Sequence, residues 1–369
     1  MISSEITLEK RPFTKKITFN EPFEMECRSS LPSVTIAYET YGKLNDDGTN
    51  VIMVCHALTG DAHASNYCSP EFKDEVAPGW WDGAIGAGKA FDPEKYFIIC
   101  SNILGSCYGT TGPYSVNPET GKRYKTDFPQ MTVRDIVHLQ YKLITHLGIK
   151  KIKSIAGGSL GGMQALEWAL LYPDYVESII PIAVGARHSA WAIGLNEIQR
   201  KIITEDPEWN NGNYDKQPNK GLETARMLGM ITFRTPESFQ KKFGRRVKNE
   251  ADNKLIPFYE VESYLRYQGE KLVNRYDANT YLYISRTCDL HDVSKNRGSI
   301  EDALGQIKAK TLCIGVDTDI LYPPAEQKEI AALVPGAEYK EIVSIHGHDA
   351  FLIEFEQMNV ILKDFLNKV

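Results

Sequence analysis

The stretch that decides the fold is Gly157-Gly158-Ser159-Leu160-Gly161, which fits the pattern G-x-S-x-G. An apolar run over residues 152–156 precedes it, and helical apolar spacing over 160–172 follows it. In that setting the glycines let the chain turn sharply from strand to helix, and the serine hydroxyl is left exposed at the carboxyl end of the strand. The pattern predicts that Ser159 is a nucleophile. The alternative is a glycine-rich helix start that only binds an anion.

Strand and helix patterns alternate around this motif. Strand patterns cover residues 34–38, 51–55, 96–100, 152–156, 177–184, 311–316 and 338–343. Helical spacing covers residues 133–147, 160–172, 325–334 and 350–368. Strands that alternate with helices form βαβ units, so we expect an α/β protein with a mostly parallel sheet.

Residues 187–300 interrupt this alternation. They contain no convincing buried strand, and their helix-like stretches cover residues 192–204, 221–231, 261–267 and 279–286. We therefore expect one α/β core built from both ends of the chain, residues 1–186 and 301–369. Residues 187–300 are expected to form a helical lid inserted into that core.

The composition excludes several classes of protein. The chain has 369 residues, 42% of them hydrophobic and 24% charged, with a net charge of −6. These values are ordinary for a globular protein and argue against disorder, nucleic-acid binding and anionic membrane surfaces. No apolar run approaches the ~18 residues that span a bilayer, and the N-terminus lacks the apolar segment of a signal peptide. We expect a cytoplasmic protein.

The cysteines and histidines give little sign of a metal site. The seven cysteines form no CxxC pair, which argues against a disulfide framework and a structural zinc site. Cys55, Cys100 and Cys313 lie in or beside apolar runs and are interpreted as small buried hydrophobic residues, whereas Cys107 lies in a glycine-rich loop. His56 and His63 have no matching cluster of ligands. We expect neither a metal nor a cofactor.

A serine nucleophile needs a base and an acid that orients the base. His348, which follows the strand pattern at 338–343, is the base we expect, and His346 is interpreted as a solvated loop residue. Asp317 and Asp319 both follow the strand pattern at 311–316, and their spacing of two leaves both open. We prefer Asp319, nearer the loop apex, and the other aspartate would form a turn.

The tetrahedral intermediates of acyl transfer need two N–H donors. The N–H of Leu160, at the start of the helix after Ser159, is the first candidate. On this topology the second comes from the loop after an early strand. Residues 56–61 form such a loop, and the N–H of Leu58 is our candidate there.

Several longer motifs resemble the homoserine O-acetyltransferase family, and they run over nearly the whole chain. They are HALTGDAH at 56–63, GWWD at 79–82, SNILGSCYGTTGP at 101–113, GGSLGGMQALEW at 157–168, ARM at 225–227, DILYPP at 319–324 and GHDAF at 347–351.

The resemblance implies an α/β-hydrolase core, a helical lid that also forms a homodimer, and an acyl-enzyme mechanism. Acetyl would pass from acetyl-CoA, a co-substrate, to L-homoserine by ping-pong kinetics, in methionine biosynthesis. Ser159 would be the nucleophile, Asp319 the acid and His348 the base.

The resemblance also implies substrate contacts. Arg226 matches a lid arginine that holds the substrate carboxylate, a task that suits a planar guanidinium. Asp349 would suit the substrate ammonium. Phe233-Arg234 departs from the family, in which many members have Tyr before Arg, and the missing hydroxyl weakens any hydrogen-bonding role at position 233.

Other functions use the same residues. A homoserine O-succinyltransferase or a serine O-acyltransferase would keep the fold and the triad. A serine esterase would use water instead of an amino acid, and a binding protein of the same fold would usually lose one of the three catalytic residues. Acyl transfer wins over hydrolysis only where the acceptor is positioned and water is excluded, which we assign to the lid at 187–300.

Overall fold

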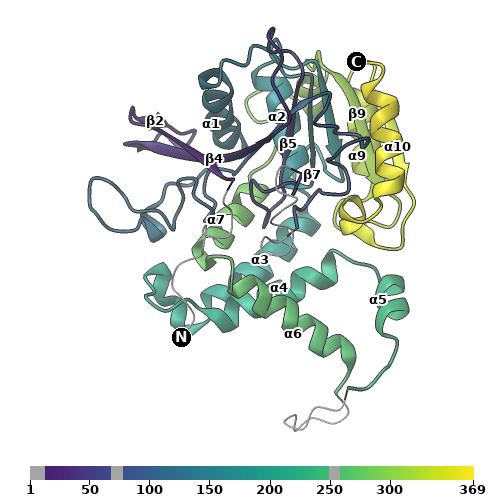
Figure 1. The fold of residues 1–369 in the computed structure, drawn as a ribbon. Helices are drawn as coiled ribbons and strands as arrows, with labels where there is room; N and C mark the ends of the chain where they lie inside the picture. The colour runs from purple at the N-terminus through teal and green to yellow at the C-terminus, as the bar shows by residue number, and fades with distance from the viewer. Residues whose placement is uncertain (1–12, 68–77, 249–257) are drawn as a thin grey trace.

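The fold is built on a mostly parallel eight-stranded sheet (Figure 1). The structure, a computed structural model, describes residues 13–67, 78–248 and 258–369. Two N-terminal strands are antiparallel to their neighbours and the other six run parallel, as the sequence predicted. The strand order is β1 (Lys15–Phe19), β4 (Val34–Tyr41), β6 (Phe97–Ser101), β5 (Val51–Cys55), β7 (Ser154–Gly158), β8 (Ser178–Ile182), β9 (Lys310–Val316) and β10 (Glu338–Ile342). A separate small hairpin joins β2 (Phe23–Glu24) and β3 (Ser30–Leu31).

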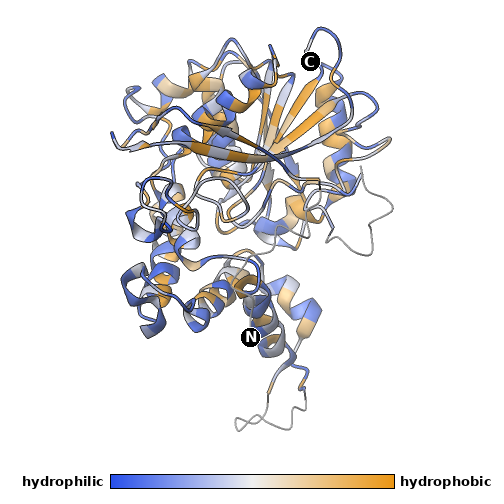
Figure 2. Cartoon of the chain, turned by 60° about the vertical axis from the view of Figure 1, so that its left-hand side comes forward, coloured by the Kyte–Doolittle hydropathy of each residue, from blue (hydrophilic) through white to orange (hydrophobic). Residues whose placement is uncertain are grey.

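Both faces of the sheet are covered by helices. Successive side chains of β5 alternate between the faces, so Met53 packs into the core on one face and Ile52 into the core on the other. The first core includes α1 (Val133–His146) and α2 (Leu160–Leu171), and the second includes α10 (Phe355–Leu366). Apolar side chains therefore dominate the central strands (Figure 2).

The chain between β8 and β9 is mainly helical, as predicted. Its helices of eight residues or more are α3 (Ala190–Thr204), α4 (Asn219–Thr232), α5 (Pro236–Phe243), α6 (Glu260–Val273) and α7 (Ala278–Asp289). They lie beside the carboxyl ends of the strands, with α4, α5 and α6 farthest from the sheet (Figure 1). The sequence analysis missed α5, although Thr235 caps it by accepting a hydrogen bond from the N–H of Ser238. The short α8 (Ile300–Leu304) leads back to β9, and α9 (Pro324–Leu333) joins β9 to β10.

The predicted single helix over 350–368 is wrong. The chain instead forms the 3₁₀ helix η5 (Gly347–Leu352) and then α10. The carbonyl of Phe351 accepts a hydrogen bond from Trp81 Nε1 at 3.2 Å, and the N–H of Phe355 donates to Ile353 instead. This exchange removes an i to i+4 bond at the point where a continuous helix would need it.

Other features of the chain bear on the site less directly. Cys55, Cys100 and Cys313 are buried as predicted, and so is Cys107. Cys68 lies outside the described residues. No helix in the described part of the chain has the length and apolar character needed to cross a membrane.

Candidate active site

The turn at Ser159 is tight, and the neighbouring glycines make it possible. Ser159 stands between β7 and α2 with φ 56° and ψ −124°, a conformation that side-chain-bearing residues seldom adopt. A Cβ on Gly161 would lie 2.1 Å from the carbonyl oxygen of Cys55, and one on Gly157 would lie 2.6 Å from the carbonyl carbon of Gly161. The N–H of Ser159 donates to Ile182 of the next strand at 2.9 Å, which ties the strained residue to the sheet.

The structure brings Asp319, and not Asp317, to the ring of His348. Asp319 Oδ2 lies 2.7 Å from His348 Nδ1, and both residues are buried. The other oxygen of Asp319 accepts the N–H groups of Leu321 and Tyr322 at 2.8 and 3.0 Å, which fixes the carboxylate. Asp317 Oδ1 accepts the N–H of Ser344 at 2.9 Å, a contact within the scaffold.

The carboxylate of Asp319 determines the direction in which the pKa of His348 shifts. Burial alone would lower the pKa of His348, but the charge and hydrogen bond of Asp319 act in the opposite direction, with a further contribution from Asp349. The net result is a raised pKa. Because Nδ1 is bonded to a carboxylate, Nε2 is the nitrogen left to accept a proton.

Ser159 and His348 line the same cavity, which measures about 120 Å³. Side chains of the sheet domain and of α3, α4 and α7 meet there. Residues around it are Ala57, Leu58, Thr59, Ser159, His188, Leu195, Asn196, Gln199, Arg226, Thr232, Phe233, Cys288, Leu321, Tyr322, His348, Asp349, Phe351 and Leu352.

The two proposed oxyanion donors lie beside this cavity. Leu160 is the first residue of α2, so its N–H has no acceptor inside the helix. The N–H of Leu58 donates to no other group in the described part of the chain. The chain between α6 and α7 holds this loop, because Tyr276 donates to the carbonyl of Leu58 at 2.7 Å and Arg275 to that of Thr59 at 2.8 Å.

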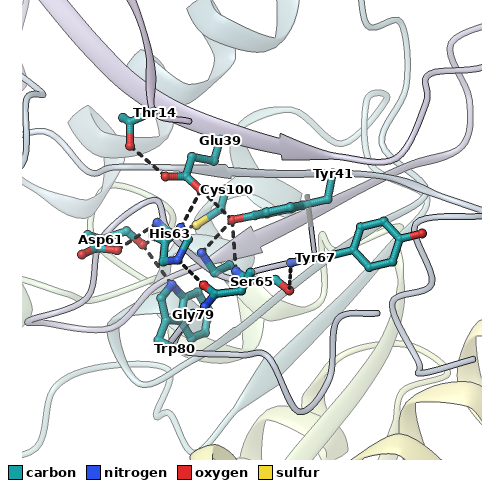
Figure 3. Close-up of polar contacts among 12 residues, drawn as sticks. Thr14, Glu39, Tyr41, Asp61, His63, Ser65, Tyr67, Gly79, Trp80 and Cys100 are labelled. Atoms are coloured by element: carbon teal, nitrogen blue, oxygen red, sulfur yellow. Dashed lines mark hydrogen bonds and ion pairs between the residues drawn. The ribbon is translucent and has the colours of Figure 1, made fainter. Parts of the chain in front are cut away.

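His56 and His63 serve the scaffold. His56 Nε2 accepts the N–H of Ile103 at 3.2 Å, and Nδ1 lies 2.9 Å from the carbonyl of Ala57. His63 Nδ1 pairs with Glu39 Oε2 at 2.9 Å in a buried network that also includes Tyr41 (Figure 3). This network ties the loop after β5 to β4. In the described part of the chain no group of His, Cys, Asp and Glu is arranged to hold a metal ion.

Comparisons with known proteins identify the family. Residues 50–355 match the family model of the α/β-hydrolase fold. Homoserine O-acetyltransferase from Carboxydothermus hydrogenoformans is 52% identical over 96% of this chain and 95% of its own length, and the one from Deferribacter desulfuricans is 50% identical over 96% of both chains. This chain belongs to the homoserine O-acetyltransferase family.

Solved structures of two kinds of enzyme superpose closely on this chain of the homoserine O-acetyltransferase family. Homoserine O-acetyltransferase from Bacillus anthracis superposes with a TM-score of 0.88 at 31% identity, covering 96% of this chain and 98% of that one. Esterase E22 superposes with a TM-score of 0.86 at 32% identity, covering 96% of this chain and all of that one. The fold alone therefore does not separate acyl transfer from hydrolysis.

Two charged residues that the family resemblance assigned to substrate line the cavity. Arg226, half-buried on α4, has no carboxylate partner in the described part of the chain, and its guanidinium lies 5.7 Å from the ring centre of Phe233. Burial lowers its pKa, and the charge of Arg275 adds to that effect. Asp349 is already paired, because Arg234 Nε lies 2.9 Å from Asp349 Oδ2.

The sequence analysis missed several residues that lie beside the candidate active site of this member of the homoserine O-acetyltransferase family. Burial raises the pKa of Tyr322 well above its usual value, while a hydrogen bond with the Ser159 side chain opposes that rise. The Tyr322 hydroxyl also lies 3.3 Å from His188 Nε2. Tyr322 lies inside the motif at 319–324 that carried the family resemblance, which was the available signal. Arg275 and Tyr276 lie in no such motif.

Proposed function

We propose that this protein is a homoserine O-acetyltransferase that moves an acetyl group from acetyl-CoA to L-homoserine through acetyl-Ser159. The observation that carries the proposal is one cavity lined by Ser159, by His348 with its buried partner Asp319 behind it, and by Arg226, whose guanidinium has no carboxylate partner among the described residues. A nucleophile with its base explains acyl chemistry. The guanidinium explains an amino-acid acceptor, because it can bind a carboxylate through two parallel hydrogen bonds.

In the first half-reaction, Ser159 Oγ attacks the thioester carbonyl carbon while His348 Nε2 takes the hydroxyl proton. The N–H groups of Leu58 and Leu160 stabilise the oxyanion. The C–S bond then breaks, and His348 returns the proton to the sulfur, so that CoA leaves as a thiol. The Asp319 carboxylate stabilises the imidazolium that exists between these two proton transfers.

In the second half-reaction, the hydroxyl of homoserine takes the place of the thiol. His348 accepts the hydroxyl proton, the homoserine oxygen attacks the acetyl carbon, and the same two N–H groups stabilise the new oxyanion. The ester bond to Ser159 breaks and Oγ regains its proton from His348. Arg226 holds the carboxylate of homoserine, and Asp349, although paired with Arg234, is the nearby acid for its ammonium.

The charged side chains that line the cavity favour an acetyl over a succinyl group. Within the described residues that line it, Arg226 is the one arginine or lysine, so a succinyl carboxylate would compete with the acceptor for that guanidinium.

A serine esterase is the second candidate, since esterase E22 has a closely similar fold. The two functions differ in whether water reaches acetyl-Ser159. Side chains from α3, α4 and α7 cover the serine, and we infer that residues 187–300 act as the lid that excludes water.

Release of CoA thiol separates the candidates. Purified protein is given acetyl-CoA with and without L-homoserine, and succinyl-CoA in parallel. We expect release that requires homoserine and acetyl-CoA, and a Ser159→Ala variant slower by roughly a thousandfold or more. Equal release without homoserine would establish the esterase, release only with succinyl-CoA would change the donor, and normal turnover of the variant would overturn the mechanism.

We also infer that the protein forms a homodimer through its inserted helices and acts in the cytoplasm. The dimer is supported by apolar side chains that these helices expose, among them Trp191 and Ile198 of α3. The cytoplasm is supported by the substrate, because acetyl-CoA is a metabolite of the cell interior.

A further inference from the structure

A second cavity lies directly beside the catalytic one. It measures about 320 Å³ and is formed by α5, α6 and the chain before η5. Arg234 and Asp349 form the boundary, because Arg234 lines this cavity, Asp349 lines the catalytic cavity, and the two are paired at 2.9 Å. Its lining residues are Arg234, Ser238, Phe239, Lys241, Lys242, Phe243, Tyr264, Ile345 and His346.

The wall of this cavity carries a local excess of positive charge. Arg234 is paired with Asp349, but Lys241 and Lys242 have no carboxylate partner in the described part of the chain. Residues 241–248, KKFGRRVK, contain five basic residues and no acidic one. Of the five, Lys241 and Lys242 line the cavity, and Arg246 is paired with Glu260 at 2.7 Å. Burial and the neighbouring charge of Arg234 lower the pKa of Lys242. An anion in the cavity would offset the repulsion between the positive charges of Lys242 and Arg234.

Aromatic rings line the same wall. Lys242 Nζ lies 4.2 Å from the ring centre of Tyr264, whose ring packs 4.9 Å from that of Phe243. Tyr264 is partly exposed, and a cation beside such a ring forms a surface that suits a planar nucleotide base joined to phosphates.

A simpler explanation of the two lysines and a second basic cavity both have to be considered. Lysines in the last turn of a helix are favoured by the helix dipole, which explains why they occur in α5 but not why they meet a cavity. Another cavity, lined by Arg123, Lys125 and Lys216, is also basic. There, however, Asp215 and Asp277 line the same cavity, Lys125 lies 3.7 Å from Asp215 and Lys216 is paired with Glu208, so most of the positive charge is matched.

We propose that the cavity at Arg234, Lys241 and Lys242 binds the phosphates of the nucleotide end of the acyl-CoA donor, with the base against the ring of Tyr264. The proposal rests on the proposed function, which supplies a donor that carries both a nucleotide and an acyl thioester. The two cavities meet at the Arg234–Asp349 pair and share no lining residue, so a donor that occupies both would pass its pantetheine arm alongside this pair.

The test compares two donors that share a thioester but differ in the nucleotide. The double variant Lys241→Gln/Lys242→Gln is assayed with acetyl-CoA and with S-acetylpantetheine, both with L-homoserine. Since hydrogen bonds to charged groups contribute about 1.5–3 kcal/mol, we expect kcat/KM for acetyl-CoA to fall about tenfold or more relative to acetylpantetheine, mainly through KM. Lys241→Arg/Lys242→Arg should restore the ratio.

Two controls make the outcome specific. Lys125→Gln/Lys216→Gln, in the cavity whose charges are mostly matched, should leave the ratio of the two donors unchanged. Adenosine 3′,5′-bisphosphate should compete with acetyl-CoA in the wild type and about tenfold more weakly in the Lys241/Lys242 variant.

Three results would overturn the proposal: an equal loss with both donors, no loss with either, or inhibition by inorganic phosphate as strong as by the bisphosphate. The proposed function is judged separately, because homoserine-dependent transfer by the wild type from either donor supports it whatever the lysine variants do.

Discussion

At the scale of single residues, the pairing of His348 with Asp319 governs the response of the site to pH. His348 must be neutral to accept a proton, and Asp319 raises its pKa above the ordinary 6.5. The base is therefore lost as the pH falls through this raised value, and kcat/KM should fall with it on the acid side.

Asp319→Asn tests this coupling. Without the carboxylate, burial dominates and the pKa of His348 falls, so the acid limb of kcat/KM should move to lower pH. The rate itself should drop by roughly 10³ to 10⁴, because the ring loses the partner that fixes its tautomer. Asp317→Asn is the matched control, since Asp317 accepts the N–H of Ser344 within the scaffold and does not meet the ring of His348. An acid limb that stays in place in Asp319→Asn would contradict the assignment.

The sequence could predict these residue types but not every contact. The order of serine, acid and histidine follows from the topology, whereas a spacing of two could not separate Asp317 from Asp319. The turn after β9 distinguishes the two aspartates, because the N–H groups of Leu321 and Tyr322 in this turn hold Asp319 beside the ring of His348. The pairing of Arg234 with Asp349 joins residues far apart in the sequence, and no local pattern records it.

At the scale of elements, the link between α6 and α7 supports the loop at Leu58, which we propose contributes to the oxyanion hole. Tyr276 is buried, and its hydroxyl donates to the carbonyl of Leu58 at 2.7 Å. The lid segment therefore holds the Leu58–Thr59 peptide, which adjoins the peptide that carries the Leu58 N–H, although it contributes no donor of its own. Geometry of this kind matters because an oxyanion donor acts only when it is aimed at the developing charge.

Tyr276→Phe should lower kcat by about tenfold with little change in the KM for acetyl-CoA, because a misaligned donor affects the transition state. Tyr283→Phe is the matched control, since its hydroxyl donates to the carbonyl of Phe128 at 2.7 Å, away from the site. Each variant should lose about 1–2 kcal/mol of unfolding free energy in urea titrations. Equal kcat values for the two variants would mean that Tyr276 has only a structural role.

Elements with strong patterns were predictable and those made by tertiary contacts were not. The apolar run of β5 matched its observed bounds, because a strand buried on both faces leaves a continuous signal. The break between η5 and α10 depends on the indole of Trp81, more than 250 residues away, and a helical period cannot reveal it.

At the scale of the whole molecule, the inserted helices divide the chain into a sheet that holds the proposed catalytic residues and a cover that completes the cavity. The alternation of strands and helices predicted the first part, and its interruption predicted the second. The outer surface of the inserted helices exposes large apolar side chains. Trp191 and Ile198 are more than half exposed and lie seven positions apart, so they share one face of α3.

An apolar face of this kind suits a contact between two copies of the chain. Light scattering after gel filtration should give twice the chain mass of 41.6 kDa for the wild type, and the single chain mass for Trp191→Glu/Ile198→Glu. Val360→Glu is the matched control, because Val360 is 70% exposed on α10, outside the inserted helices, and its replacement should leave the dimer intact. Because all three side chains are exposed, circular dichroism should be unchanged in both variants. A wild type that is monomeric at micromolar concentration would exclude the dimer, and a dimer that survives the double substitution would move its interface away from this face of α3.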